Sequence, residues 1–183
     1  MQHWSVGDSE EGEGGSTMNG GELTTSDWTV TVIGEQAMGS LGMALARASA
    51  AHLPLAVGLT GDLGTGKTRL AQGVGAGLVL GTDVVSPTFA LICEHEGSIP
   101  LLHADLYRLE PAELPGIGLE EQLEEWEGLA LVEWVDRAPG VLPLDHLHVF
   151  LEAPDPTCRV VRVFARGPRS AAALAAWKEQ WGT

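Results

Sequence analysis

The eight residues from Gly61 to Thr68 constrain the fold of this chain more than any other stretch. They read GDLGTGKT and match the pattern GxxxxGK[ST]. The 183-residue chain has only one other lysine, Lys178, and a chance match in such a composition has a probability of about 0.004. The pattern requires a buried strand before it and a helix after it. Here PLAVGLT precedes the loop and RLAQGV follows it, so the sequence predicts a strand–loop–helix unit.

The residue types of this loop suit the binding of phosphate groups. Its glycines allow the backbone to curl so that successive N–H groups point inward, and the helix N-terminus adds partial positive charge. Lys67 would bridge the β- and γ-phosphates of a nucleotide, and Thr68 would offer a hydroxyl to magnesium. The alternative is a glycine turn that only caps the helix. The predicted nucleotide site comprises Gly61, Asp62, Leu63, Gly64, Thr65, Gly66, Lys67 and Thr68.

Alternating strand and helix patterns along the chain predict an α/β fold. The sheet is expected to be mixed and mostly parallel at its centre, with helices on both faces and an antiparallel edge formed by the two long late strands. Met38, Leu41 and Leu45 recur at helical spacing and predict a buried helix face. Strands are expected at 28–33, 54–60, 89–94, 99–105, 129–133, 146–152 and 159–165, and helices at 35–51, 69–80, 119–126 and 170–181.

Composition divides the chain into a tail and one domain. Residues 1–26 are acidic and rich in Gly, Ser and Thr, so we expect a disordered tail before a single domain over 27–183. The net charge of −15 argues against direct nonspecific binding to nucleic acid. No signal-peptide pattern or membrane-length apolar run is present, so we expect a cytoplasmic protein with no membrane partner. Cys93 and Cys158 have no metal-like spacing, which favours two buried thiols over a disulfide or metal site.

Two predicted strands end in acids. IPLLHAD ends at Asp105 and LALVE ends at Glu133, and carboxyl ends of parallel strands form the ligand-binding edge of an open α/β sheet. Either acid could instead be a solvated strand end. Between loop and acids, Pro87 stiffens a connection that carries Ser86 and Thr88, which is either a plain turn or a segment that senses the γ-phosphate.

These blocks together resemble a known family. GDLGTGKT, SPTFAL, HADLYRLEPAEL, GIGLEEQL and LVEW occur in this order and are closely similar to the TsaE family, also known as YjeE. Its members are bacterial P-loop ATPases of the tRNA threonylcarbamoyladenosine pathway. The resemblance covers roughly residues 28–165, and the HxDLYR and VEW blocks are far more specific than the loop alone. It implies a P-loop NTPase fold.

The resemblance also implies roles for individual residues. ATP and Mg²⁺ would be the cofactors, with Thr68 and Glu133 serving magnesium and Asp105 acting as a second required acid near the γ-phosphate. Which acid positions the attacking water stays open. Ser86 and Thr88 fall in the family's first switch. Further positions are Trp134, which matches a tryptophan near the nucleotide, and His103, Tyr107 and Arg108, which complete the HxDLYR block.

The implied activity is ATP hydrolysis that is weak alone and activated by two partner proteins, TsaB and TsaD. Hydrolysis would reset their complex between rounds, and tRNA would be reached only through them. One departure concerns the adenine contacts, because Glu35 to Met38 stand where family members commonly have a threonine.

Two other functions are compatible with the loop. A small-molecule kinase would also use it, although residues 70–158 contain only Arg108 and Arg137, too few for an obvious arginine-rich lid. A nucleotide-dependent binding module, in which ATP mainly sets the shape offered to partners, overlaps with the ATPase.

Overall fold

A computed structural model of the chain describes residues 27–79, 91–110, 112–113 and 116–182. The predicted tail at 1–26 and the predicted switch residues Ser86 and Thr88 lie outside these ranges. No helix among the described residues is long and apolar enough to cross a membrane.

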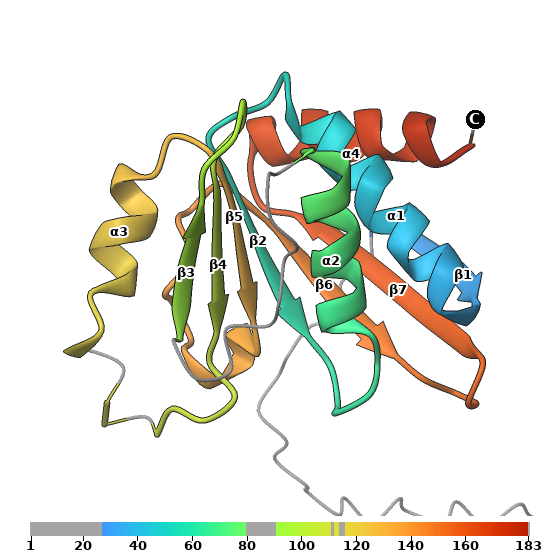
Figure 1. Cartoon of the computed structure of the whole chain (residues 1–183), viewed down its shortest axis with the longest axis horizontal. Helices are drawn as coiled ribbons and strands as arrows, with labels where there is room; N and C mark the ends of the chain where they lie inside the picture. Colours follow the sequence, from blue (N-terminus) through green and yellow to red (C-terminus); the bar gives the residue numbers. More distant parts are fainter. Residues whose placement is uncertain (1–26, 80–90, 111, 114–115, 183) are drawn as a thin grey trace, which may run out of the picture.

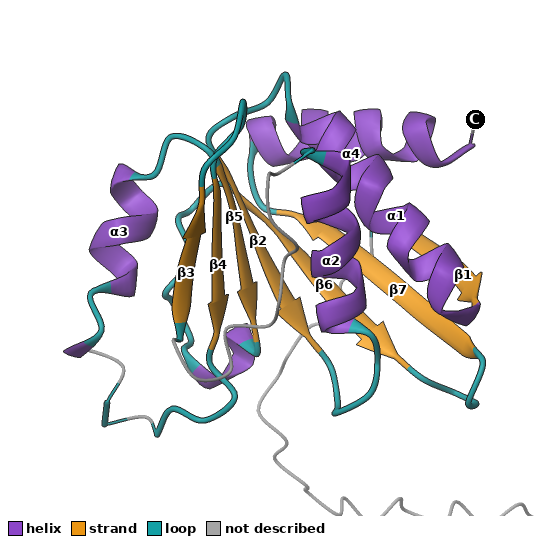
Figure 2. Ribbon diagram, in the orientation of Figure 1, coloured by secondary structure: helices purple, strands orange, loops and turns teal. Residues whose placement is uncertain are grey.

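The described domain is built on a seven-stranded sheet with the order β1-β7-β6-β2-β5-β4-β3 (Figures 1 and 2). The four central strands β6, β2, β5 and β4 are parallel; β7 pairs antiparallel with β6, and β1 pairs antiparallel with β7. This confirms the predicted mixed sheet with an antiparallel edge. The opposite edge is antiparallel too, because β3 and β4 are joined by too short a connection for a parallel crossover. The strands are β1 Trp28–Ile33, β2 Leu55–Thr60, β3 Ile92–His95, β4 Leu101–Asp105, β5 Leu129–Glu133, β6 His146–Glu152 and β7 Cys158–Ala165.

Helices cover both faces of the sheet, as predicted. Side chains alternate along β2, so Val57 packs in one core cluster with α1, α2 and α4, whereas Ala56 packs in a second cluster with α3. Met38, Leu41 and Leu45 are all buried in the first cluster, which confirms the predicted face of α1. The helices are α1 Gly34–Ser49, α2 Lys67–Gly77, α3 Leu119–Glu125 and α4 Pro168–Gly182, with a 3-10 turn, η2, at Val135–Arg137.

Two glycines bring the backbones of α1 and α2 together. A Cβ atom on Gly42 would lie 2.2 Å from the carbonyl oxygen of Leu70, and one on Gly73 would lie 2.2 Å from that of Gly39. Any larger residue would force the helices apart. This packing fixes the direction of α2, and therefore where its N-terminus points.

Element ends and cysteine burial differ slightly from expectation. α2 begins at Lys67, two residues before the predicted start, because its apolar pattern begins only at Leu70 while its first turn continues the loop. Cys93 and Cys158 are free thiols, but they are half-buried and not fully buried as predicted. One lies on the edge strand β3 and the other at the start of β7.

Candidate functional site

The parallel strands deliver the loop and both acids to one edge of the sheet. Glu133 at the end of β5 pairs with Leu59 of β2 on one side and with Asp105 of β4 on the other. The arrowheads of β2, β4 and β5 point to this same edge, where the loop 61–66 leaves β2 (Figure 1). The topology thus places the two predicted acids beside the predicted phosphate loop.

The loop backbone has the curled form that phosphate binding requires. Gly66, directly before α2, has φ +102°, and Gly64 has φ +80°, both in the left-handed region that favours glycine. A Cβ atom on Gly61 would lie 2.3 Å from the carbonyl oxygen of Leu151, so this position has no room for a side chain. Thr65 is buried and closes the curl by donating its hydroxyl to the carbonyl oxygen of Asp62 at 2.8 Å.

Lys67 is a buried cation at the centre of this curl. Its side chain is only 4% exposed, and its Nζ donates to the carbonyl oxygens of Gly61 (2.5 Å) and Asp62 (2.9 Å). Nζ also lies 3.5 Å from the centre of the Trp134 ring. Burial lowers the pKa of the Lys67 ammonium, and the nearby Glu133 carboxylate opposes this effect. The loop therefore holds one strongly desolvated positive charge.

Glu133 connects this loop to the sheet. It is 1% exposed, and each of its carboxylate oxygens has one partner. Thr68 donates its hydroxyl to Oε2 at 3.0 Å, and Nε2 of His103 lies 2.9 Å from Oε1. A hydroxyl and a carboxylate in contact are the hard oxygen ligands that magnesium prefers, so these two residues fit the predicted metal site. Among the described residues, no three His, Cys, Asp or Glu side chains converge on a common metal position.

Asp105 and Trp134 complete the site. Asp105 is 6% exposed, and its Oδ1 accepts the backbone N–H of Tyr107 at 3.0 Å. The Tyr107 ring packs against Trp134, with 4.8 Å between ring centres. Trp134 has φ +59°, a conformation that is rare for a bulky residue and costs of order 1–3 kcal/mol. In this conformation the half-buried indole lies beside Lys67 and also packs against the second core cluster.

A hollow of about 260 Å³ adjoins the loop, and the sequence did not predict it. Gly64 and Gly66 form one wall, and Met38, Arg69 and Arg159 contribute side chains. Arg159 also donates to the carbonyl oxygen of Gly64 at 3.2 Å. The hollow forms only where the start of α1 meets the connection between β6 and β7, so no local pattern could have revealed it.

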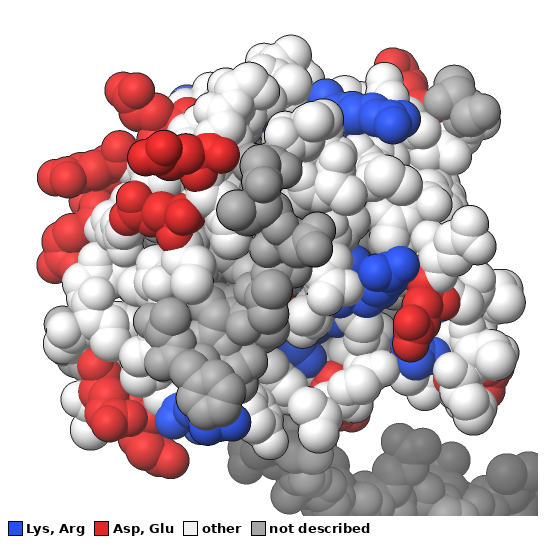
Figure 3. Space-filling model, in the orientation of Figure 1, with Lys and Arg blue, Asp and Glu red and all other residues white. Residues whose placement is uncertain are grey.

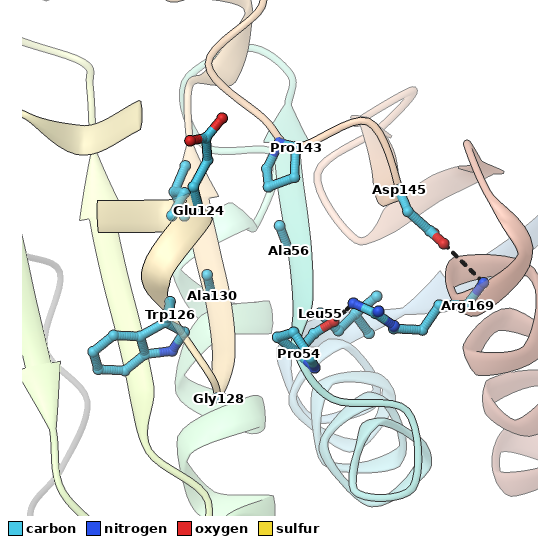
Figure 4. A pocket seen from close by; sticks show the side chains of 11 residues that line it. Pro54, Leu55, Ala56, Glu124, Trp126, Gly128, Ala130, Pro143, Asp145 and Arg169 are labelled. Carbon is cyan, nitrogen blue, oxygen red and sulfur yellow. Dashed lines mark hydrogen bonds between the residues drawn. The ribbon is translucent and has the colours of Figure 1, made fainter. Parts of the chain in front are cut away.

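A second hollow, of about 190 Å³, lies at the opposite end of the parallel strands (Figure 4). Two of its charged groups, Arg169 and Asp145, are already engaged. Arg169 donates to the carbonyl oxygen of Pro54 at 2.8 Å, and Asp145 accepts the backbone N–H groups of Arg169 (2.9 Å) and Ser170 (2.8 Å). These bonds lower the pKa of Asp145 despite the cost of burial. The carboxylate caps α4, so this hollow has a structural explanation.

Acidic side chains gather over α3, at the left of Figure 3. Four exposed glutamates lie on this seven-residue helix, which carries no base: Glu120, Glu121, Glu124 and Glu125. The surface over α3 would therefore repel a polyanion such as RNA.

Comparisons with known proteins give a consistent result. A family model described as "Threonylcarbamoyl adenosine biosynthesis protein TsaE" matches residues 33–161. Relatives from Nostoc sp., Synechocystis sp. and Bacillus subtilis, each named "tRNA threonylcarbamoyladenosine biosynthesis protein TsaE", are 46, 46 and 38% identical to this chain. The alignments cover 57, 49 and 61% of this chain and 67, 61 and 70% of the respective relatives. The crystal structure of Bacillus subtilis YdiB superposes with a TM-score of 0.68 at 28% identity, covering 83% of this chain and 94% of YdiB.

Proposed function

This chain belongs to the TsaE family, and we propose that it is the ATPase component of the bacterial machinery that makes threonylcarbamoyladenosine in tRNA. It hydrolyses ATP in complex with TsaB and TsaD in the cytoplasm, and hydrolysis supports repeated rounds of modification. The observation that carries the proposal is the direct contact of Thr68 with Glu133 beside a phosphate loop in a TsaE-family chain.

The loop holds the phosphates of ATP. The backbone N–H groups of Gly64, Gly66 and Thr68 and the N-terminus of α2 supply positive potential, and Lys67 moves from its carbonyl partners to the β- and γ-phosphates. The adenine base of ATP occupies the hollow of about 260 Å³ next to the loop, where the exposed Arg69 can lie over the adenine ring.

The acids divide the remaining work. Thr68 and Glu133 would hold Mg²⁺, which would supply neutralisation of charge on the phosphates. Asp105, at the adjacent strand end, keeps one carboxylate oxygen on the N–H of Tyr107. This bond helps to orient the carboxylate, which acts as the second required acid near the γ-phosphate.

Partner dependence agrees with the charge of the molecule. The chain carries 25 acids against 10 bases, and the glutamates of α3 form an exposed acidic surface. Such a protein reaches tRNA through TsaB and TsaD and does not itself bind the phosphate backbone of the tRNA. Ser86 and Thr88, in the family's first switch, sense the γ-phosphate in this scheme.

An ATPase assay tests the proposal. Wild type, Lys67→Ala, Asp105→Ala and Glu133→Ala are each assayed with and without the TsaB–TsaD complex. We expect weak turnover of wild type alone, strong stimulation by the complex, and loss of stimulated turnover in all three variants. Equal rates of wild type with and without the complex would refute the proposal.

A further inference from the structure

His103 is the buried polar residue next to this site that the proposed chemistry does not use. It lies in β4, is 0% exposed, and pairs with Leu131 of β5 and Cys93 of β3. Leu101, two residues earlier on the same strand face, packs in the apolar core under α1 and α2. An imidazole in such surroundings is costly unless it is hydrogen-bonded, so its partner indicates why it is there.

The partner of His103 is the Glu133 carboxylate. Nε2 lies 2.9 Å from Oε1, and because an ionised carboxylate only accepts hydrogen bonds, Nε2 carries the hydrogen. Within the described part of the chain, Nδ1 has no hydrogen-bond partner, so the bond to Glu133 is the one polar contact that accounts for this side chain. The pair is almost fully shielded from water, with 0 and 1% exposure.

This bond fixes the direction of Glu133. With Oε1 held by His103, the carboxylate presents Oε2 to Thr68, which donates to it at 3.0 Å. Without His103, the carboxylate would be free to rotate about its last bond, and its fixed alignment with the Thr68 hydroxyl would be lost. The arrangement orders three side chains from two strands and one helix in a single line of hydrogen bonds.

We propose that His103 is a positioning residue that aligns Glu133 for magnesium bound with ATP; this rests on the magnesium site of the proposed function. His103 contacts neither nucleotide nor metal. Partners that orient metal ligands in this way typically contribute 10–100-fold to metal affinity.

The test compares His103→Leu, which fills the space without a donor, with His103→Gln, whose amide can replace Nε2. Binding of a β,γ-imido analogue of ATP is measured by calorimetry in EDTA and over a range of Mg²⁺ concentrations, and folding is checked by thermal unfolding. We expect wild-type affinity in EDTA for both variants. The Mg²⁺ concentration that gives half of the Mg²⁺-dependent gain in affinity for the analogue should rise roughly tenfold or more in His103→Leu. In His103→Gln it should be close to the wild-type value.

The outcomes separate the two claims. An unchanged Mg²⁺ requirement in folded His103→Leu overturns the role of His103 and leaves the proposed function standing. Wild type whose binding ignores Mg²⁺ refutes the metal site, and the role of His103 with it. If His103→Leu does not fold, His103→Asn replaces it, because its shorter amide stays polar but does not reach Glu133; it must then show the same raised Mg²⁺ requirement.

Discussion

Replacing Lys67 by methionine should separate nucleotide binding from stability. Methionine keeps an apolar stem next to Trp134 but removes the ammonium. The variant loses two hydrogen bonds to loop carbonyls and the contact with the indole, yet it no longer buries a charge that is only 4% exposed. These effects oppose each other, so the free energy of unfolding without nucleotide should change by less than about 1 kcal/mol.

The effect on ATP binding should be much larger. Each charge-assisted hydrogen bond from Nζ to a phosphate oxygen contributes about 1.5–3 kcal/mol. Two such bonds, less the carbonyl and ring contacts that Nζ gives up, leave roughly 3 kcal/mol, which corresponds to about a 100-fold loss of affinity. Calorimetric titration with a nonhydrolysable ATP analogue and Mg²⁺ measures this loss, and thermal unfolding measures the stability.

The chain offers a matched control for this experiment. Lys178, its only other lysine, lies in α4 and donates its Nζ to the carbonyl oxygen of Asp27 at 2.8 Å. Lys178→Met makes the same chemical change and should bind the analogue like wild type. The reasoning is refuted if Lys67→Met binds as tightly as Lys178→Met, or if its weaker binding merely follows from unfolding.

Three further predictions concern the loop, the helix pair and the response to pH. Arg159→Met should weaken binding of the ATP analogue about tenfold, because it removes a hydrogen-bond donor to Gly64 and part of the wall of the hollow beside the loop. Arg162→Met, on the same strand, should leave the affinity unchanged. Equal affinities of the two variants in calorimetry would contradict this prediction. Gly73→Ala should lower the free energy of unfolding, measured with denaturant, by about 1–3 kcal/mol, because its Cβ would meet the carbonyl oxygen of Gly39. The control Gly116→Ala, whose Cβ would have no atom within 4 Å, should change it by less than about 0.5 kcal/mol. A Gly73→Ala variant as stable as wild type would show that α1 and α2 can separate freely. Burial, reinforced by His146 and Arg166, lowers the pKa of His148 from 6.5 to about 4, so between these pH values the unfolded chain binds more protons than the folded one. The free energy of unfolding should therefore fall as the pH drops from about 6.5 to 4, by on the order of 2 kcal/mol after allowance for partial exposure. His148→Gln should flatten this part of the curve of stability against pH, and an unchanged slope would contradict the assignment.

Much of the fold was predictable because its signals are local. The alternation of Trp28–Ile33 and the apolar run of Leu129–Glu133 give strands with the same bounds in sequence and structure. Other features leave no periodic pattern in the sequence. The antiparallel pairing of β3 with β4 follows from their short connection, and α2 begins early, at Lys67, because its first turn continues the loop.

The site was predictable to a similar extent. The candidate phosphate loop and both acids could be named because strand ends and a spaced glycine pattern carry them, and the structure brings Lys67, Asp105 and Glu133 to one edge of the sheet. The bond between His103 and Glu133 could not be named, because it depends on strand register. Arg159 could not be named either, because it reaches the loop from the start of β7, far away in the sequence.

The most direct test of the proposed function counts rounds of tRNA modification. Threonylcarbamoyladenosine is measured per TsaB–TsaD complex, with substrate tRNA in excess, in the presence of this chain, of its Lys67→Ala variant, or of neither. Wild type should allow many modified tRNAs per complex, whereas the variant or its omission should leave about one. The same yield in all three reactions would contradict a role for ATP hydrolysis in resetting the complex.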